Sequence, residues 1–322
     1  MQIAMVGLGR MGMNMARRLL RHGHEVVAFN RTAAKTKALS REGAVPAFSI
    51  SEVVERLDPP RAVWLMLPAG RTIDEHLERL SALLSSGDTV VDGGNTFYKD
   101  DLRRAEQLKD KGIRFLDVGV SGGIWGLDAG YCLMAGGDRG AFDALRPVLT
   151  SLAPDEGCLY CGPTGAGHFV KMVHNGIEYG MMQAYGEGFE LLHASPYGAS
   201  LDYADVSRLW NRGSVIRSWL LELAESAFRK DGDLSGVRGY VDDSGEGRWT
   251  VQQAVECSVS APVITLSLME RFRSRKTDPF SSRLTAALRR EFGGHAVMET
   301  DGGVENEKPS ETPRRERGDR VE

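Results

Sequence analysis

Long apolar runs, cysteine and an excess of either charge are all scarce in this chain of 322 residues. No uninterrupted run of about 18 apolar residues occurs. Near the N-terminus, glycines and charged residues interrupt any apolar core of the kind that a signal peptide needs. The sequence therefore predicts no membrane span and a cytoplasmic protein.

The charges are nearly balanced, because 40 basic side chains face 44 acidic ones and leave a formal net charge of -4. A protein that neutralises a phosphate backbone needs an excess of cations, so nucleic-acid binding is disfavoured. The content of charged residues, 26%, and of hydrophobic residues, 42%, is that of an ordinary globular protein.

Four cysteines in a chain of this length do not form a disulfide framework. Cys158 and Cys161 make a C-x-x-C pair, but neither a second pair nor a nearby histidine completes a tetrahedral zinc site. We therefore predict that Cys132, Cys158, Cys161 and Cys257 are reduced structural thiols and that the protein has no metal site.

The first half of the chain alternates short apolar runs with amphipathic stretches, which predicts a parallel, doubly wound α/β sheet of the Rossmann type. Amphipathic helices are expected between the strands, for example from Met13 to Arg21 and from Asp101 to Lys111. The predicted strands are Gln2 to Val6, Glu25 to Phe29, Ala62 to Leu67, Thr89 to Val91 and Phe115 to Val118.

The second half changes character and predicts a mainly helical domain. Gly167 to Ala194 has helical spacing and no proline. We predict domains at 1–164 and 165–298, followed by a disordered polar tail at 299–322, where apolar residues are few. Further helices are predicted at Asp205 to Phe228, Val251 to Cys257, Pro262 to Arg273 and Ser281 to Arg290.

A glycine-rich turn follows the first strand directly, with the sequence Gly7-Leu8-Gly9-Arg10-Met11-Gly12. In this G-x-G-x-x-G pattern the glycines allow a tight turn and close approach of the backbone to a pyrophosphate, which the N-terminus of the next helix then faces. A purely structural glycine turn is the alternative. The position between a strand and a helix favours a dinucleotide site.

The second strand ends at Asn30-Arg31-Thr32, where NAD-selective folds carry an acidic residue for the ribose 2′-hydroxyl. A carboxylate would repel a 2′-phosphate, whereas the guanidinium of Arg31 offers it a fork of donors. Arg31 could instead be a solvated surface residue. The sequence thus favours NADP over NAD, and leaves NAD open.

The densest group of polar residues lies on one predicted helix, between Gly165 and Gly180. At 100° per residue, Lys171, His174, Asn175 and Glu178 share a narrow arc, with Tyr179 at its margin. A solvated polar stripe is the alternative, but Gly176 and Gly180 would weaken such a helix without benefit. These glycines indicate close approach of another backbone or of a ligand, and so predict a site.

The run from Gly165 to Gly180 resembles the catalytic-helix signature of the decarboxylating 6-phosphogluconate dehydrogenases. Asp92-Gly93-Gly94-Asn95 and Gly119-Val120-Ser121-Gly122-Gly123 resemble the substrate loops of that family, and the similarity extends over 1–297. Long members continue through a second helical repeat, so this chain resembles the compact subgroup. Where long members carry lysine before a tryptophan, this chain has Arg248, whose fork differs from an ammonium.

The resemblance implies oxidation and decarboxylation of 6-phosphogluconate to ribulose 5-phosphate in the pentose phosphate pathway, with Lys171 as the base and Glu178 as the acid. A homodimer or homotetramer is expected, in which Arg289 and His295 reach a neighbour's site. By itself, this segment could be an ordinary basic helix end with a glycine cap. The implied substrate contacts are Asn95, Ser121, Gly122, Gly123, His174, Asn175, Tyr179, Arg248, Thr250, Arg271, Arg289 and His295. The implied coenzyme contacts are Gly7, Leu8, Gly9, Arg10, Met11, Gly12, Asn30, Arg31, Thr32, Leu67, Pro68, Ala69 and Asn95.

Two other functions stay open at this stage. A non-decarboxylating beta-hydroxyacid dehydrogenase would keep the glycine turn, the Ser121 loop and Lys171, but has less need of Glu178 and the cationic residues. A dinucleotide-sensing binding protein would bind coenzyme without turnover. Release of carbon dioxide from 6-phosphogluconate separates the three.

Overall fold

The structure, a computed structural model, describes residues 1–298. Its contacts divide the chain into two compact units, Met1–Phe272 and Arg273–Glu322. The second unit carries helix α14 (Phe280–Gly293), which ends at Gly294 in the left-handed conformation that favours glycine. The predicted disordered tail, 299–322, lies outside the described residues, and the predicted division into domains at 164 stays a prediction.

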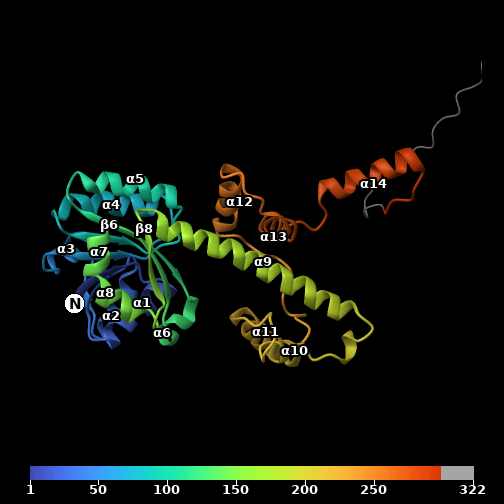
Figure 1. Cartoon of the computed structure of the whole chain (residues 1–322), viewed down its shortest axis with the longest axis horizontal. Helices are drawn as coiled ribbons and strands as arrows, with labels where there is room; N and C mark the ends of the chain where they lie inside the picture. Colours follow the sequence, from blue (N-terminus) through green and yellow to red (C-terminus); the bar gives the residue numbers. More distant parts are fainter. Residues whose placement is uncertain (299–322) are drawn as a thin grey trace, which may run out of the picture. The chain divides into compact units, whose positions relative to one another are not determined.

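The N-terminal part of the first unit contains an eight-stranded sheet with the order β3-β2-β1-β4-β5-β6-β7-β8 (Figure 1). Neighbouring strands are parallel except β6 and β7, which are antiparallel. The strands are β1 (Gln2–Val6), β2 (Glu25–Phe29), β3 (Val45–Pro46), β4 (Ala62–Leu65), β5 (Thr89–Asp92), β6 (Arg114–Ser121), β7 (Cys132–Gly137) and β8 (Cys158–Gly162).

Helices cover both faces of this sheet, because alternate residues of each buried strand point to opposite sides. On β1, Ile3 and Met5 join a core that includes Met15 of α1 and Leu149 of α8. Ala4 joins a second core, which takes apolar side chains from α3, α4 and α5. The helices of this part are α1 (Arg10–Arg21), α2 (Ala33–Ser40), α3 (Ile50–Glu55), α4 (Arg71–Leu83), α5 (Tyr98–Lys109), α6 (Gly126–Ala129), α7 (Arg139–Ala144) and α8 (Arg146–Leu152), with a short 3-10 turn at Gly123–Trp125.

The long helix α9 (Ala166–Ala194) starts against β6, β7 and β8 and continues beyond the sheet (Figure 1). Its first turn fits between strands because Gly167 has no side chain: a Cβ there would lie 2.3 Å from the Asp117 carbonyl oxygen. Ring contacts of Phe189 with Tyr203 and Phe228 join its distal half to α10 and α11. The other helical elements of this unit are the 3-10 turn Gly198–Ser200, α10 (Tyr203–Trp210), α11 (Trp219–Lys230), α12 (Glu246–Glu256) and α13 (Pro262–Arg273).

The Rossmann-type sheet followed by helices confirms the predicted fold class, with two corrections. The predicted helix from Asp205 to Phe228 is wrong as one element, since α10 ends at Trp210 and α11 starts only at Trp219. Gly213, at φ 88°, and the Ser218 N-cap of α11 break it. Strands β3, β7 and β8 were not predicted from the sequence, and β7 makes the antiparallel pair with β6.

Among the described residues, no helix has the length and apolar character that a bilayer crossing requires. The four cysteines are free thiols, as predicted, and burial raises the pKa of the Cys158 thiol to about 11. Such a thiol is protonated and unreactive at neutral pH.

Candidate active site

The glycine turn between β1 and α1 is shaped by contacts with the neighbouring strand β4. Gly7 has φ 100°, and a Cβ there would lie 2.4 Å from the Met66 carbonyl oxygen; a Cβ on Gly12 would lie 2.1 Å from the Gly7 carbonyl oxygen. Gly9 caps the N-terminus of α1, and within 1–298 no atom beyond its chain neighbours lies within 4 Å of its Cβ position. The first and third glycines therefore serve packing, whereas Gly9 leaves the helix N-terminus open to an anion.

A cavity of about 490 Å³ opens in front of this turn. Seven of the predicted coenzyme residues line it, and so do cationic side chains that sequence reasoning did not include, Lys35 and Arg79. Their positive charge and the open backbone at Gly9 fit a dinucleotide phosphate. The seven predicted residues are Gly7, Gly9, Asn30, Arg31, Thr32, Leu67 and Pro68.

Asn30 has a structural role in this cavity. Its Oδ1 accepts from the Leu8 N–H at 2.9 Å, and its Nδ2 donates to the Thr32 carbonyl at 3.3 Å. The Asn30 side chain thus joins the end of β2 to the glycine turn. Its neighbour Arg31 is exposed. Leu8, Arg10, Gly12 and Ala69 are not among the residues that line the cavity, and their coenzyme contacts stay predictions.

A second cavity, of about 720 Å³, holds the reactive residues predicted on α9. Lys171, His174, Asn175 and Glu178 all line it, as the helical arc predicts. Met11 of the glycine turn lines it too, so one turn borders both cavities. The end of β6 and the loop after it also line this cavity, with Ser121, Gly122 and Gly123.

Lys171 lies where α9 crosses β6 at close range. A Cβ on Gly119 would lie 2.3 Å from the Lys171 Cβ, so only glycine allows this approach. The Lys171 ammonium donates to Asn175 Oδ1. Burial lowers the pKa of Lys171, and the carboxylates of Glu178 and Glu246 offset this only in part. A buried lysine with a lowered pKa is suited to accept a proton near neutral pH.

His174 connects the helix to the Ser121 loop. Its Nδ1 lies 3.0 Å from Asn175 Oδ1, and its Nε2 lies 3.3 Å from Ser121 Oγ. Its Nδ1 is also 3.9 Å from Glu178 Oε2. Glu178 is about two-fifths exposed, so its carboxyl group can reach solvent as well as the cavity.

Sequence reasoning missed Glu246, the first residue of α12, whose side chain is 3% exposed. Its Oε1 accepts from Asn175 Nδ2 at 2.8 Å and from Asn95 Nδ2. Helix α12 comes this close to α9 because Gly176 faces Thr250, where a Cβ would lie 2.7 Å from the Thr250 methyl carbon. The sequence led us to expect another backbone or a ligand at Gly176, and the structure places the Thr250 side chain there instead.

The residues predicted to hold the substrate's phosphate and carboxylate lie around α12 and make protein contacts of their own. Arg248 donates to both oxygens of Asp243, at 2.8 and 3.0 Å. Thr250 is buried, with its hydroxyl 2.9 Å from the Met172 carbonyl oxygen. The Arg271 guanidinium stacks on the buried Tyr179 ring, 3.3 Å from its centroid. None of the four lines the 720 Å³ cavity, and their substrate contacts stay predictions.

Arg289 and His295 belong to the second unit. Arg289 lies on α14 and His295 follows its glycine cap, with its ring 6.3 Å from that of Phe292. This is the geometry of a basic helix end with a glycine cap. The suggestion that the two residues reach a neighbouring subunit remains a proposal.

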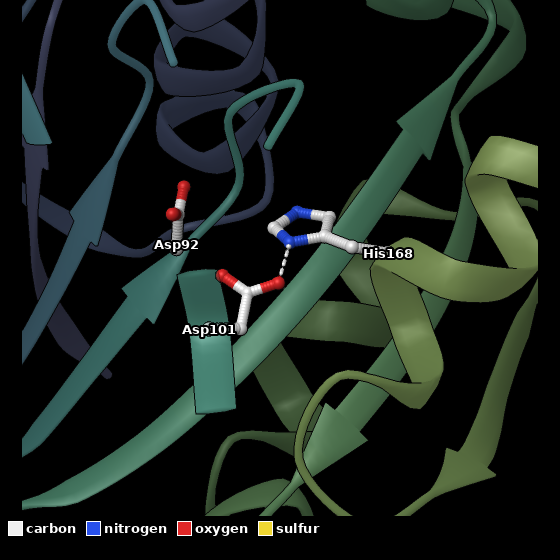
Figure 2. A group of neighbouring side chains, drawn as sticks. All are labelled: Asp92, Asp101 and His168. Carbon is white, nitrogen blue, oxygen red and sulfur yellow. Dashed lines mark hydrogen bonds and ion pairs between the residues drawn. The ribbon is translucent and has the colours of Figure 1, made fainter. Parts of the chain in front are cut away.

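A buried cluster of two aspartates and a histidine connects the elements around the site. Figure 2 shows Asp92, Asp101 and His168, with His168 Nδ1 bonded to Asp101 at 2.7 Å. Burial by itself would lower the pKa of His168, but the Asp101 carboxylate outweighs it and raises that pKa to about 9. Burial raises the pKa of Asp101 to about 7.

These three side chains come close enough to approach one cation, a grouping that the sequence did not reveal. The fully buried Arg104 supplies positive charge there instead, with Nη1 3.4 Å from Asp92 Oδ2 and 3.9 Å from Asp101 Oδ1. The cluster therefore joins the end of β5, helix α5 and the start of α9. Asn95 lies in the loop between β5 and α5, and Lys171 lies on α9.

Comparisons with known proteins agree with this geometry. Residues 2–162 match the NAD binding domain of 6-phosphogluconate dehydrogenase, and 167–291 match the 6-phosphogluconate dehydrogenase C-terminal domain. The chain is 48% identical to a Haloferax volcanii protein named 6-phosphogluconate dehydrogenase, NAD(+)-dependent, decarboxylating, over 94% of this chain and 100% of that one. It is 46% identical to YqeC of Bacillus subtilis, which carries a provisional 6-phosphogluconate dehydrogenase name, over 92% of this chain and 99% of YqeC.

Among solved structures, 6-phosphogluconate dehydrogenase of Plasmodium falciparum superposes with a TM-score of 0.78 at 27% identity. The similarity covers 94% of this chain and 67% of the Plasmodium chain. That protein was solved in its apo form, with NADP+ and with 6-phosphogluconate.

Proposed function

Because this chain belongs to the 6-phosphogluconate dehydrogenase family, we propose that it converts 6-phosphogluconate to ribulose 5-phosphate and carbon dioxide while reducing NADP+. The supporting observation is the partly buried Lys171, whose pKa is lowered by desolvation, in one cavity with Asn175, Glu178 and the Ser121 loop. This set unites a base, an acid and hydrogen-bonding groups for a hydroxy acid. The proposed place of the reaction is the pentose phosphate pathway.

Oxidation requires a proton acceptor beside the C3 hydroxyl of the substrate. The neutral Lys171 takes this proton. A nicotinamide coenzyme held at the glycine turn would supply the hydride acceptor for C3. Ser121 and Asn95 orient the substrate and the nicotinamide. The protonated Lys171 then faces the new ketone oxygen and stabilises the negative charge that develops there.

Decarboxylation follows from the position of the ketone, which is beta to the carboxylate. The ketone takes up the electron pair as carbon dioxide leaves, so this step does not require a divalent metal. Glu178, two helical turns from Lys171 on the same face of α9, protonates C1 of the resulting enediol. Its partial exposure allows the carboxyl group to regain a proton from solvent.

We assign the substrate's charged ends to Tyr179, Arg248, Thr250 and Arg271. Arg248 is held by Asp243 and would exchange this partner for the phosphate, since both are anions that a guanidinium binds with two donors. Arg289 and His295 of a neighbouring subunit are the further donors in this proposal.

A homo-oligomer is part of the proposal. Large apolar side chains stand exposed on and after the distal half of α9 and on α10: Leu191 is 74% exposed, Tyr197 70% and Leu209 66%. Exposed apolar groups of this kind favour association.

We propose NADP as the preferred coenzyme and NAD as a second one. Arg31 and Lys35 line the coenzyme cavity, and no acidic residue follows β2 directly. Cationic donors at this place favour a 2′-phosphate. The Haloferax relative is named as NAD+-dependent, so coenzyme choice needs a direct measurement.

Replacing Arg31 by Ala should raise KM for NADP+ by roughly 10- to 100-fold, the equivalent of one charge-assisted hydrogen bond, and KM for NAD+ by less than about 3-fold, because only NADP+ loses a phosphate partner. Steady-state kinetics with both coenzymes measures this. Arg41→Ala, at an exposed site outside the cavity, is the control. Equal rises for both coenzymes would contradict the assignment.

The function itself is tested by incubating purified protein with 6-phosphogluconate and each coenzyme, and by following reduced coenzyme and carbon dioxide together. Equal amounts of the two products are expected. Reduced coenzyme without carbon dioxide would point to a non-decarboxylating beta-hydroxyacid dehydrogenase. Coenzyme binding without either product would point to a sensor.

A further inference from the structure

Glu246 is the feature of the site that the proposed mechanism does not use. An acidic residue in the first turn of a helix usually faces solvent and interacts with its own helix dipole. Glu246 is buried instead, and its hydrogen bonds leave α12 for Asn95, in the loop after β5, and for Asn175 on α9. Its Oε2 is also buried and accepts no hydrogen bond from the described residues.

A carboxylate accepts hydrogen bonds and cannot donate them. Both amides must therefore turn their NH2 groups toward Glu246, whichever way an isolated amide would prefer to point. The carbonyl oxygen of Asn175 is thereby directed at the Lys171 ammonium, which donates to it. Asn95 is left with its carbonyl oxygen and its second N–H for other partners, and their directions are fixed by the bond to Glu246.

The orientation of the Asn175 amide also determines the direction of the hydrogen bonds that His174 and Ser121 make. Since Asn175 Oδ1 is an acceptor, His174 Nδ1 at 3.0 Å must carry the proton of that contact. In the neutral ring, Nε2 is then an acceptor, and the Ser121 hydroxyl at 3.3 Å donates to it. One buried carboxylate thus determines the direction of the hydrogen bonds from Asn175 to Ser121.

We propose that Glu246 is a positioning residue, which orients the amides of Asn95 and Asn175 and thereby holds Lys171 in place for proton transfer. This inference rests on the proposed function for its kinetic consequences. Its structural part, the effect on Lys171, does not depend on the identity of the substrate.

The charged groups around Lys171 determine how a substitution of Glu246 changes the pKa of Lys171. Glu178 from α9 and Glu246 from α12 both favour the ammonium form, as does Cys132 from β7, and burial opposes them. Without Glu246, the Lys171 ammonium has one negative charge fewer in its surroundings. The Asn175 side chain also becomes free to turn its NH2 group toward that ammonium. Both changes lower the pKa of Lys171.

Two substitutions separate orientation from charge. Glu246→Gln keeps an oxygen that can accept from both amides and removes the charge, so kcat should fall by less than about 10-fold. Glu246→Leu removes the acceptor as well, so kcat should fall by about 10²-fold with KM little changed, a loss typical of misplaced catalytic groups. Glu256→Gln, at an exposed carboxylate of the same helix that pairs with Lys99, should match wild type.

A second measurement is independent of turnover. The rate at which acetic anhydride acetylates Lys171 is followed against pH by peptide mass spectrometry, because only the neutral amine reacts. The midpoint should move to lower pH in both Glu246 variants and stay unchanged in Glu256→Gln. Thermal unfolding of each variant verifies that it is folded, and Glu246→Gln, which is nearly isosteric, gives a result even if the Leu variant does not fold.

A wild-type midpoint in folded Glu246→Gln, or wild-type kcat in folded Glu246→Leu, would overturn the proposal. A lower melting temperature without either change would assign Glu246 a purely structural role and overturn it too. If the wild-type protein fails to oxidise 6-phosphogluconate, the proposed function falls, and the acetylation midpoints still decide whether Glu246 controls Lys171.

Discussion

Replacing Lys171 by Ala should lower kcat for 6-phosphogluconate by about 10²- to 10⁴-fold, because the C3 hydroxyl loses the base that accepts its proton. In the wild-type protein, burial lowers the pKa of Lys171, and the base must be neutral to act. Activity should therefore fall as the pH drops through that pKa. In Lys171→Ala this acidic limb of the pH profile should disappear along with most of the rate.

Two controls define the expected loss. Coenzyme affinity, measured by fluorescence of the reduced form, should not change, because Lys171 lies outside the 490 Å³ coenzyme cavity. Glu178→Gln should behave differently from Lys171→Ala, because the acid acts after hydride transfer: in a single turnover, ribulose 5-phosphate should lag behind reduced coenzyme. Lys171→Ala with near wild-type kcat would remove the proposed base from the mechanism.

Replacing Gly119 by Ala should lower kcat by about 10²-fold without touching any group that reacts. The added methyl carbon would lie 2.3 Å from the Lys171 Cβ, which belongs to a packed helix and cannot move alone. Helix α9 must shift at β6, and a displacement of about 1 Å can cost that much activity. Overpacking should also destabilise the fold by about 1–3 kcal/mol. Kinetics and denaturant unfolding on one preparation measure both effects.

Gly186→Ala is the matched control for Gly119→Ala. Gly186 lies in the exposed distal half of α9, and among the described residues no atom beyond its own stretch of helix comes within 4 Å of its Cβ position. Alanine is the better helix former by about 1 kcal/mol, so this variant should be slightly more stable and, where it assembles as the wild type does, keep the wild-type kcat. Gly119→Ala with wild-type kcat would show that the close crossing of α9 and β6 does not position Lys171.

The parts of the fold that the sequence predicted are those whose signal is local. Strand β2 was predicted with its observed ends, and α9 to within one residue, because their periodicity persists without interruption. Strand β7 was missed since its last two residues are glycines, and its antiparallel pairing with β6 is a tertiary property. The break between α10 and α11 depends on turn residues inside an otherwise helical pattern.

The site residues likewise divide into those that a local pattern predicts and those that only tertiary packing brings together. Lys171, Asn175 and Glu178 share one helix, so spacing alone predicted that they would meet. Glu246 is 71 residues from Asn175 and 151 from Asn95, and no pattern within the chain connects them. The sequence predicted this helix only from Val251, so Glu246, where α12 begins, lay outside it. Only the packing of α12 on α9 reveals what it contacts.

The 29-residue helix α9 consists of two parts that should differ in hydrogen exchange. Its buried residues fall between Gly167 and Gly180, and none lies in the distal half. Amides of the proximal half should exchange only through nearly global unfolding, whereas those beyond Gly180 can open locally at much lower free energy. Lys171 lies well inside the slowly exchanging part, so fluctuations of the distal half, where a partner copy is proposed to bind, can occur without releasing the base from its place.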